Sequence, residues 1–205
     1  MDILAKLFGS EARVRILRLF FLNPDGHFET SDIARKTKIT PSTVWKELAT
    51  LRSIGLIKKQ QFYKETSQRG KILKKKTHGW SFDKTFRYSG ELKNLLVSTD
   101  LVKKDDILDR FRKAGVIKLL VISGIFIKND TSRLDILLVG DHLKRHMIEN
   151  TLRTLEAEAG KELRYAILDT PEFQYRLSVY DKFVRDILDY PHETIIDRVG
   201  AEERV

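Results

Sequence analysis

The stretch Thr30–Lys59, TSDIARKTKITPSTVWKELATLRSIGLIKK, contains two helical patterns separated by a short turn. The first helix is short, and Thr30 or Ser31 is expected to be its N-cap. The turn is Lys38–Thr40, and a longer helix is predicted over residues 41–54 because its apolar residues recur with helical spacing. A glycine ends this longer helix, and the residues that follow it, LIKKQQFYK, are typical of a strand.

The helix predicted over residues 41–54 has two unlike faces. Thr40 is expected to cap it, and Pro41 stands at its first position, where a missing N–H is tolerated. Apolar residues at i, i+4 and i+7 are expected to face a core, and they are Val44, Leu48 and Leu51. Four other side chains lie on or near the opposite face by the N-terminal turn, and they are Ser42, Thr43, Trp45 and Lys46. Such an end can be presented to base edges in the major groove of DNA.

A strongly basic hairpin is predicted over residues 57–80, with a polar tip from Glu65 to Gly70. From Lys58 to Lys76 the chain has eight basic residues and one acidic residue. A hairpin with this charge is not a core element, and it is expected to lie as a wing along DNA phosphates. The expected phosphate contacts are Lys58, Lys59, Lys64, Arg69, Lys71, Lys74, Lys75 and Lys76.

The charge of the chain is unevenly divided. The 205 residues carry a formal net charge of +9, yet residues 1–89 hold 19 Lys and Arg against 8 Asp and Glu. The remainder is slightly acidic, which indicates a polyanion-binding module joined to a different domain. There is no cysteine, which fits a reducing cytosol. No signal peptide and no apolar stretch of membrane-spanning length is recognised, so a cytoplasmic protein without a membrane partner is expected.

The order of elements over Leu4–Trp80 resembles a known class of repressors. An apolar pattern with helical spacing runs from Leu4 to Phe21 and stops at residues 23–26, before the helix pair and the basic hairpin. This order resembles the winged helix-turn-helix repressors of the ArsR and MarR type. The resemblance implies that Ser42, Thr43, Trp45 and Lys46 approach double-stranded DNA and that wing lysines contact its backbone. Such regulators usually read pseudo-palindromic sites, so a homodimer is expected.

Residues 90–205 are predicted to form a second, α/β domain that begins with a helical linker over residues 90–114. Dense apolar segments at 116–127 and 134–140 are interpreted as buried strands, with further strands at 162–168 and 193–197. Helices are expected between them. The fold class is therefore α+β, with a winged helix domain over residues 1–89 and a small mixed sheet of three or four strands in the second domain.

The second domain resembles the minimal nucleotidyltransferases of the DNA polymerase β superfamily over Ile107–Asp197. The resemblance rests on Gly124 after the first strand and on RLDILLVGD, Arg133–Asp141. It implies a Gly-Ser phosphate cradle and paired carboxylates that bridge two metal ions. Here Ile125 replaces the serine and Arg133 the first carboxylate, so only Asp135 remains.

A degenerate nucleotide pocket without metal or cofactor is the resulting interpretation, made of Ser123, Gly124, Arg133 and Asp135. Asp135 is expected to pair with Arg133 or another base. The domain would then serve dimerisation, partner binding or the sensing of a small-molecule or nucleotide effector. The alternatives are a nucleotidyltransferase of toxin–antitoxin type that uses a relocated acid, Asp130 or Asp169, and a nucleotide sensor without chemistry.

Overall fold

The computed structural model describes residues 3–68, 71–98, 104–129 and 131–201. The chain forms two compact units, of which unit 1 comprises residues 1–99 and 156–161, and unit 2 comprises residues 100–155 and 162–205. Unit 1 therefore extends beyond residue 90, where the domain boundary was expected. The reason is α5 (Ser89–Ser98), which was expected in the linker but packs in the core of unit 1 through the fully buried Leu96.

The first apolar pattern of unit 1 folds as two helices, α1 (Ile3–Phe8) and α2 (Glu11–Leu22), rather than as the single helix predicted. Gly9 separates them with a φ of 69°, a conformation in which most side chains would be strained. Ser10 then caps α2, because its hydroxyl accepts a hydrogen bond from Arg13 N at 3.1 Å. Gly9 and Ser10 therefore mark the end of one helix and the start of the next. The helical spacing of the apolar residues on both sides concealed this boundary.

The helix pair is present as α3 (Thr30–Thr37) and α4 (Pro41–Ser53), after the short strand β1 (His27–Phe28). The N-cap of α3 is Glu29, not Thr30 or Ser31. Thr40 is the N-cap residue of α4, but its hydroxyl makes no capping bond and lies 2.9 Å from Thr43 Oγ1. The turn between the helices is closed by Lys38, which adopts a left-handed conformation with a φ of 54°.

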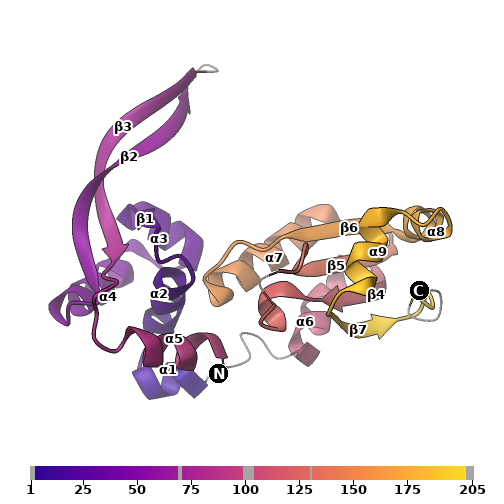
Figure 1. The fold of residues 1–205 in the computed structure, drawn as a ribbon, viewed down its shortest axis with the longest axis horizontal. Helices are drawn as coiled ribbons and strands as arrows, with labels where there is room; N and C mark the ends of the chain where they lie inside the picture. Colours follow the sequence, from indigo (N-terminus) through magenta and orange to yellow (C-terminus); the bar gives the residue numbers. More distant parts are fainter. Residues whose placement is uncertain (1–2, 69–70, 99–103, 130, 202–205) are drawn as a thin grey trace. The chain divides into compact units, whose positions relative to one another are not determined.

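The predicted hairpin is longer than its sequence suggested. Strands β2 (Ile57–Gln68) and β3 (Lys71–Phe82) pair antiparallel along their whole length, from Ile57 opposite Phe82 to Gln68 opposite Lys71. Glu65, expected in the tip, is paired with Lys74 instead. The sheet has the order β1-β3-β2. Figure 1 shows the two strands extending as a long twisted ribbon beyond the helices of unit 1.

The core of unit 1 holds the helices and the base of the hairpin in fixed positions. Ile33 of α3 and Val44 and Leu48 of α4 are fully buried, as the spacing predicted for α4. Phe21 packs against Phe82 with ring centroids 4.9 Å apart, so α2 contacts the end of β3. Burial of aromatic and branched side chains of this size stabilises a domain by about 2 kcal/mol each.

Unit 2 contains a four-stranded mixed sheet, as expected, in the order β6-β5-β4-β7. The strands are β4 (Val116–Ile122), β5 (Ile136–Asp141), β6 (Tyr165–Asp169) and β7 (Glu193–Asp197). β5 is antiparallel to β4 and parallel to β6, and β7 is antiparallel to β4.

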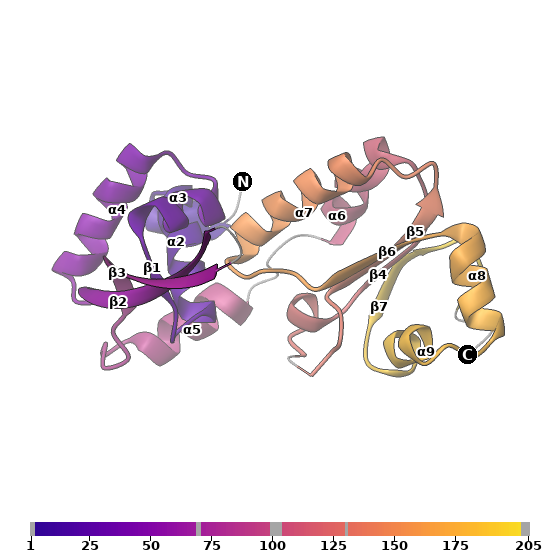
Figure 2. The same ribbon diagram turned by 90° about the horizontal axis from the view of Figure 1, so that it is seen from above.

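Helices cover both faces of this sheet, which explains the dense apolar strands. They are α6 (Lys104–Phe111), α7 (Arg145–Ala159), α8 (Thr170–Ser178) and α9 (Lys182–Asp189). Figure 2 shows α6 and α7 on one side of the sheet and α9 on the other. Phe173 of α8 and Val184 of α9 share a core with Leu119 and Leu137 of the sheet. Within the described residues, none of the helices is long and apolar enough to cross a membrane.

Candidate nucleic-acid interface

The four side chains predicted to contact DNA lie at the N-terminal end of α4, on the side of the helix that faces away from the core. Ser42, Trp45 and Lys46 are exposed and Thr43 is half-buried. Trp45 is unusual among them, because 53% of a large aromatic side chain meets solvent. A bulky aromatic group and an ammonium group at the start of an exposed helix can contact base edges and phosphates.

A buried glutamate that the sequence analysis missed fixes the position of α4. Glu47 is 7% exposed. Its carboxylate accepts hydrogen bonds from Ser10 Oγ at 2.6 Å and from Arg13 Nε at 2.8 Å. The signal was available, since Glu47 lies between Val44 and Leu48 on the face of the helix that turns inward. This ion pair joins α4 to the start of α2, so the exposed turn is carried on a firmly held helix.

The β2–β3 hairpin, called the wing from here on, has two different faces because alternate residues of a strand point to opposite sides. By the register, one face carries odd residues of β2 and even residues of β3. We call it the open face, and its members beyond the core whose side chains are described are Lys59, Gln61, Tyr63, Glu65, Lys74, Lys76 and His78. The other is the clamp face, with Lys58, Lys64, Lys75 and Thr77.

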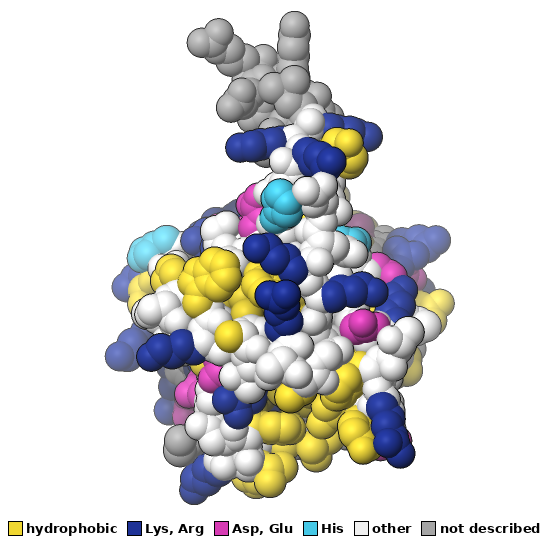
Figure 3. All heavy atoms as spheres, turned by 90° about the vertical axis from the view of Figure 1, so that its left-hand side faces the viewer, with side chains coloured by type: hydrophobic (Ala, Val, Ile, Leu, Met, Phe, Trp, Pro, Cys, Tyr) yellow, Lys and Arg dark blue, Asp and Glu magenta, His cyan; other side chains and the backbone are white. Residues whose placement is uncertain are grey.

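The open face lies on the same side of unit 1 as the exposed turn of α4. Trp80, at the base of the open face, meets the ring of Trp45 edge-on with centroids 6.2 Å apart. Further along this face, Tyr63 is 67% exposed and lies opposite Lys76. On the face of the molecule drawn in Figure 3, Lys and Arg side chains lie on the wing and beside exposed hydrophobic groups. The Trp45–Trp80 contact thus links the exposed turn of α4 to the base of the open face.

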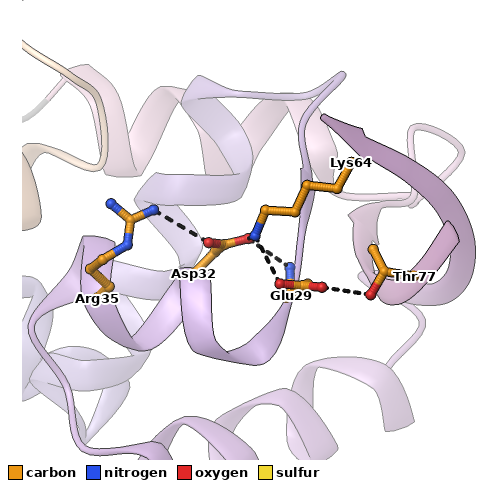
Figure 4. Close-up of polar contacts among 5 residues, drawn as sticks. All are labelled: Glu29, Asp32, Arg35, Lys64 and Thr77. Atoms are coloured by element: carbon orange, nitrogen blue, oxygen red, sulfur yellow. Dashed lines mark hydrogen bonds and ion pairs between the residues drawn. The ribbon is translucent and has the colours of Figure 1, made fainter. Parts of the chain in front are cut away.

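The clamp face is bonded to the start of α3 through Lys64 and Thr77. Lys64 Nζ lies 2.8 Å from Glu29 Oε2 and 2.7 Å from Asp32 Oδ2. Thr77 Oγ1 donates to Glu29 Oε1 at 2.5 Å, and Arg35 Nη2 lies 3.3 Å from Asp32 Oδ1. Figure 4 shows the first turn of α3 bonded in this way to both strands of the wing.

These contacts change the titration of the groups involved. Hydrogen bonds from Lys64 and then Thr77 hold the pKa of Glu29 below its ordinary value. For Asp32, burial raises the pKa, but bonds from Lys64 and Arg35 outweigh burial and the net shift is downward. Bonds to Asp32 and then Glu29 raise the pKa of Lys64. Lys64 and both carboxylates are therefore fully charged near neutral pH.

The eight predicted phosphate contacts consequently differ in availability. Lys59, Lys75 and Lys76 are exposed, and no acidic partner is found for them among the described residues. Lys74 lies 3.7 Å from Glu65 and Lys58 lies 4.0 Å from Asp83, both at exposed positions where solvent screens the attraction. Arg69 lies outside the described residues, as does the side chain of Lys71. Of the predicted phosphate contacts whose side chains are described, Lys64 alone has its charge balanced by two carboxylates.

In unit 2, Asp135 is bonded to its own chain. The side chain is 1% exposed, and Oδ1 accepts from Ile125 N at 3.0 Å. Oδ2 accepts from Arg164 N at 2.8 Å and lies 3.4 Å from Arg164 Nε. The expected partner was Arg133 or another base, and the base is Arg164. Arg133 instead pairs with Asp186 of α9 at 2.7 Å.

The residues expected to surround a nucleotide pack against this aspartate. Gly124 has a φ of 58°, and a Cβ atom there would lie 1.9 Å from Asp135 Oδ1. Ser123 is buried and its hydroxyl donates to Leu134 O, while Ile125 is 8% exposed. The glycine is thus required by the buried carboxylate, without any need for a phosphate.

The described relocated acid, Asp169, gives no substitute site. Asp169 caps α8, because its carboxylate accepts from Glu172 N at 2.7 Å, and Asp130 lies outside the described residues. Among the residues that the structure describes, no group of three or more His, Asp or Glu side chains could hold a metal ion.

Comparison with known proteins agrees with the geometry of unit 1. No curated protein and no solved structure matches the chain. Residues 10–59 match the model of the family described as "Bacterial regulatory protein, arsR family". The match begins at Ser10, includes α3 and α4, and ends in the first residues of β2, so it extends neither to the rest of the wing nor to unit 2. Residues 10–59 are therefore similar to the helix-turn-helix domain of arsR-family regulators, which supports a DNA-binding transcriptional regulator.

Proposed function

We propose that this protein regulates transcription by reading duplex DNA with the N-terminal turn of α4. Ser42, Trp45 and Lys46 would enter the major groove, with Thr43 at the edge of the contact. The observation that carries the proposal is the edge contact between Trp45 and Trp80, which puts the exposed turn and the open face of the wing on one side. A DNA duplex can then meet both features at once.

The open face of the wing would follow the phosphate backbone beside that groove. Lys59, Lys74 and Lys76 supply the charge, and Tyr63 supplies a hydroxyl donor at a side chain that is 67% exposed. Contacts of this kind orient a protein on DNA and carry most of the salt dependence of binding. Glu65 on the same face opposes binding and limits the strength of non-specific attachment.

We further propose that two copies act together. A pair of α4 helices, one from each copy, would read two half-sites about one DNA turn apart. Ile3 and Leu7 of α1, which are 77% and 67% exposed, support a contact between copies because apolar side chains of this size are seldom left in water together.

The proposed role of unit 2 is pairing, partner binding or effector sensing without nucleotidyl transfer. The support is Asp135, whose oxygens already accept the amide protons of Ile125 and Arg164. A carboxylate so engaged cannot coordinate magnesium without breaking bonds to its own chain.

Selection from a random-sequence duplex pool tests the main proposal, because the pool contains every short operator sequence that the protein could read. We expect enrichment of an inverted repeat, with affinity that falls steeply as salt increases. Failure to retain any duplex at low salt would contradict it.

A thermal-shift screen of the four nucleoside triphosphates, with and without magnesium or manganese, tests unit 2 separately. A metal-dependent shift would restore a sensor or transferase role.

A further inference from the structure

The cluster of Glu29, Asp32, Lys64 and Thr77, called the wing clamp from here on, lies on the face of the wing opposite the proposed DNA contact. Lys64 and Thr77 belong to the clamp face by register. Both point toward the first turn of α3, where Glu29 and Asp32 bond to them (Figure 4). The clamp is therefore formed between one face of the wing and the helix that precedes α4.

We infer that the wing clamp sets the angle of the wing relative to α4, so that Lys64 and Glu29 are positioning residues for DNA binding. This inference rests on the proposed function, and it replaces the sequence-based prediction that Lys64 contacts a phosphate. The revision follows from charge, since a cation bonded to two carboxylates at 2.8 and 2.7 Å has no free charge for a phosphate.

A long hairpin needs such a restraint. Near its base, the wing is held by β1, which pairs with β3 through His27–Ser81 and Phe28–Trp80, and by the ring contact between His27 and Phe62. Lys64 lies well beyond those pairs, at the level of Lys75. A bond at that level restricts bending of a two-stranded ribbon far more than contacts at its base. The chain from α3 to α4 is a turn of three residues, so whatever holds the wing to α3 also fixes it relative to the exposed turn of α4.

The wing itself provides a matched control, because Lys75 lies directly opposite Lys64 on the same face. Lys75 is exposed, whereas the side chain of Lys64 is 34% exposed and bonded. Lys64→Met and Lys75→Met remove the same charge from the same level of the same face. If the lysines act only through charge, the two variants weaken binding equally. If the clamp positions the wing, Lys64→Met weakens binding about threefold or more relative to Lys75→Met, the range for a partly exposed ion pair.

A second pair of variants distinguishes positioning from charge more directly, because the two explanations predict opposite changes in DNA affinity for one of them. Glu29→Gln and Glu65→Gln each remove one negative charge from a DNA-binding unit, and charge alone predicts tighter binding for both. The clamp predicts opposite outcomes. Glu65 is an exposed residue on the open face, so its neutral variant binds about twofold more tightly, whereas Glu29→Gln binds more weakly than the parent. Thr77→Val changes no charge and is expected to weaken binding while the salt slope stays constant.

The experiment is fluorescence anisotropy of the full chain with a labelled duplex from the selected pool, at several salt concentrations. Tighter binding by Glu29→Gln, or equal loss in Lys64→Met and Lys75→Met, would overturn the inference. In the Lys64→Met background, Glu29→Gln should cause no further loss, because the bond it removes is already absent.

A measurement without DNA distinguishes failure of the clamp from failure of the proposed function. The chain has no cysteine, so Arg52→Cys on α4 and Lys74→Cys on the wing provide two unique sites for spin labels. We expect one narrow distance distribution in the parent and a broader one after Glu29→Gln or Lys64→Met, but not after Lys75→Met. Unchanged distributions in all variants would overturn the inference even if DNA binds, and broadening in a chain that binds no duplex would support the clamp alone.

Discussion

The first turn of α4 in unit 1 leaves Ser42 and Lys46 in water, whereas the segment before β5 in unit 2 buries Asp135 against two backbone amides. Both segments carry residue types that bind ligands in other proteins. Their difference is whether the polar groups are already bonded within the chain. A side chain that meets a ligand exchanges bonds with water, which costs little, whereas a buried and bonded side chain must first break internal bonds. The comparison therefore favours recognition by α4 and a structural role for Asp135.

The largest expected effect is on Asp135. Replacement by alanine leaves Ile125 N, Arg164 N and the Arg164 guanidinium without their acceptor inside unit 2. We expect Asp135→Ala to lower the free energy of unfolding by about 3 kcal/mol or more. Denaturant unfolding followed by circular dichroism measures this change. Asp169→Ala is the control, because it removes an exposed N-cap of α8 and should cost only about 1 kcal/mol.

An Asp135→Ala variant that unfolds like the parent would break the comparison. Together with a metal-dependent nucleotide shift that disappears in the variant, it would show that the carboxylate binds a ligand after all.

Local patterns explain how much could be predicted. The buried face of α4 and the strands of unit 2 follow from helical spacing and from dense apolar runs, signals that lie within about ten residues. Ile125 and Arg133, which replace residues of a phosphate and metal site, are likewise recognised within one short segment of sequence. The partner of Asp135, by contrast, is Arg164, 29 residues away in sequence.

The wing clamp could not be predicted for a related reason. Lys64 is one of eight basic residues in its segment, and nothing in its immediate neighbours distinguishes it. Its partners Glu29 and Asp32 lie 35 and 32 residues earlier. Only the register of the hairpin and the cap position of Glu29 bring these charges together.

The break at Gly9 was a local signal, but the continuous apolar spacing on both sides of it concealed the interruption.

The same distinction between free and engaged groups applies to apolar side chains. Ile3 and Leu7 of α1 are exposed, while Leu4 between them is buried. If two copies pair through α1, Ile3→Ser with Leu7→Ser should weaken the pair by about 3 kcal/mol, from the loss of two buried side chains. Light scattering after size-exclusion chromatography over a range of concentrations measures it. Val179→Ser, which alters an exposed apolar residue of unit 2, is the control; dissociation by that variant instead would assign pairing to unit 2.

On α4, Lys46→Glu tests the exposed turn itself. The reversed charge at the groove should weaken binding to the selected duplex by about 2 kcal/mol, with a smaller change in melting temperature than Asp135→Ala causes. Arg52→Glu, which makes the same charge change at the last turn of α4, should have a much smaller effect. Equal losses in anisotropy titrations would mean that net charge, rather than the exposed turn, determines binding.

The smallest expected effect is the pH dependence of the wing clamp. Glu29 and Asp32 are faced by Lys64, Arg35, Thr77 and each other, and both carboxyl pKa values are lowered in the folded chain. A group whose pKa is lower when folded stabilises the fold above its unfolded pKa, and this contribution is lost as pH falls through the folded value. Relative to Glu29→Gln, the parent should therefore be more stable by up to about 1 kcal/mol near neutral pH. That difference should shrink as pH falls below the ordinary carboxyl pKa of about 4.

Thermal unfolding of parent and variant between neutral and acidic pH measures this difference in stability, with Glu65→Gln as the exposed control. A difference between parent and Glu29→Gln that persists at low pH would mean that Glu29 stabilises unit 1 by something other than its charge.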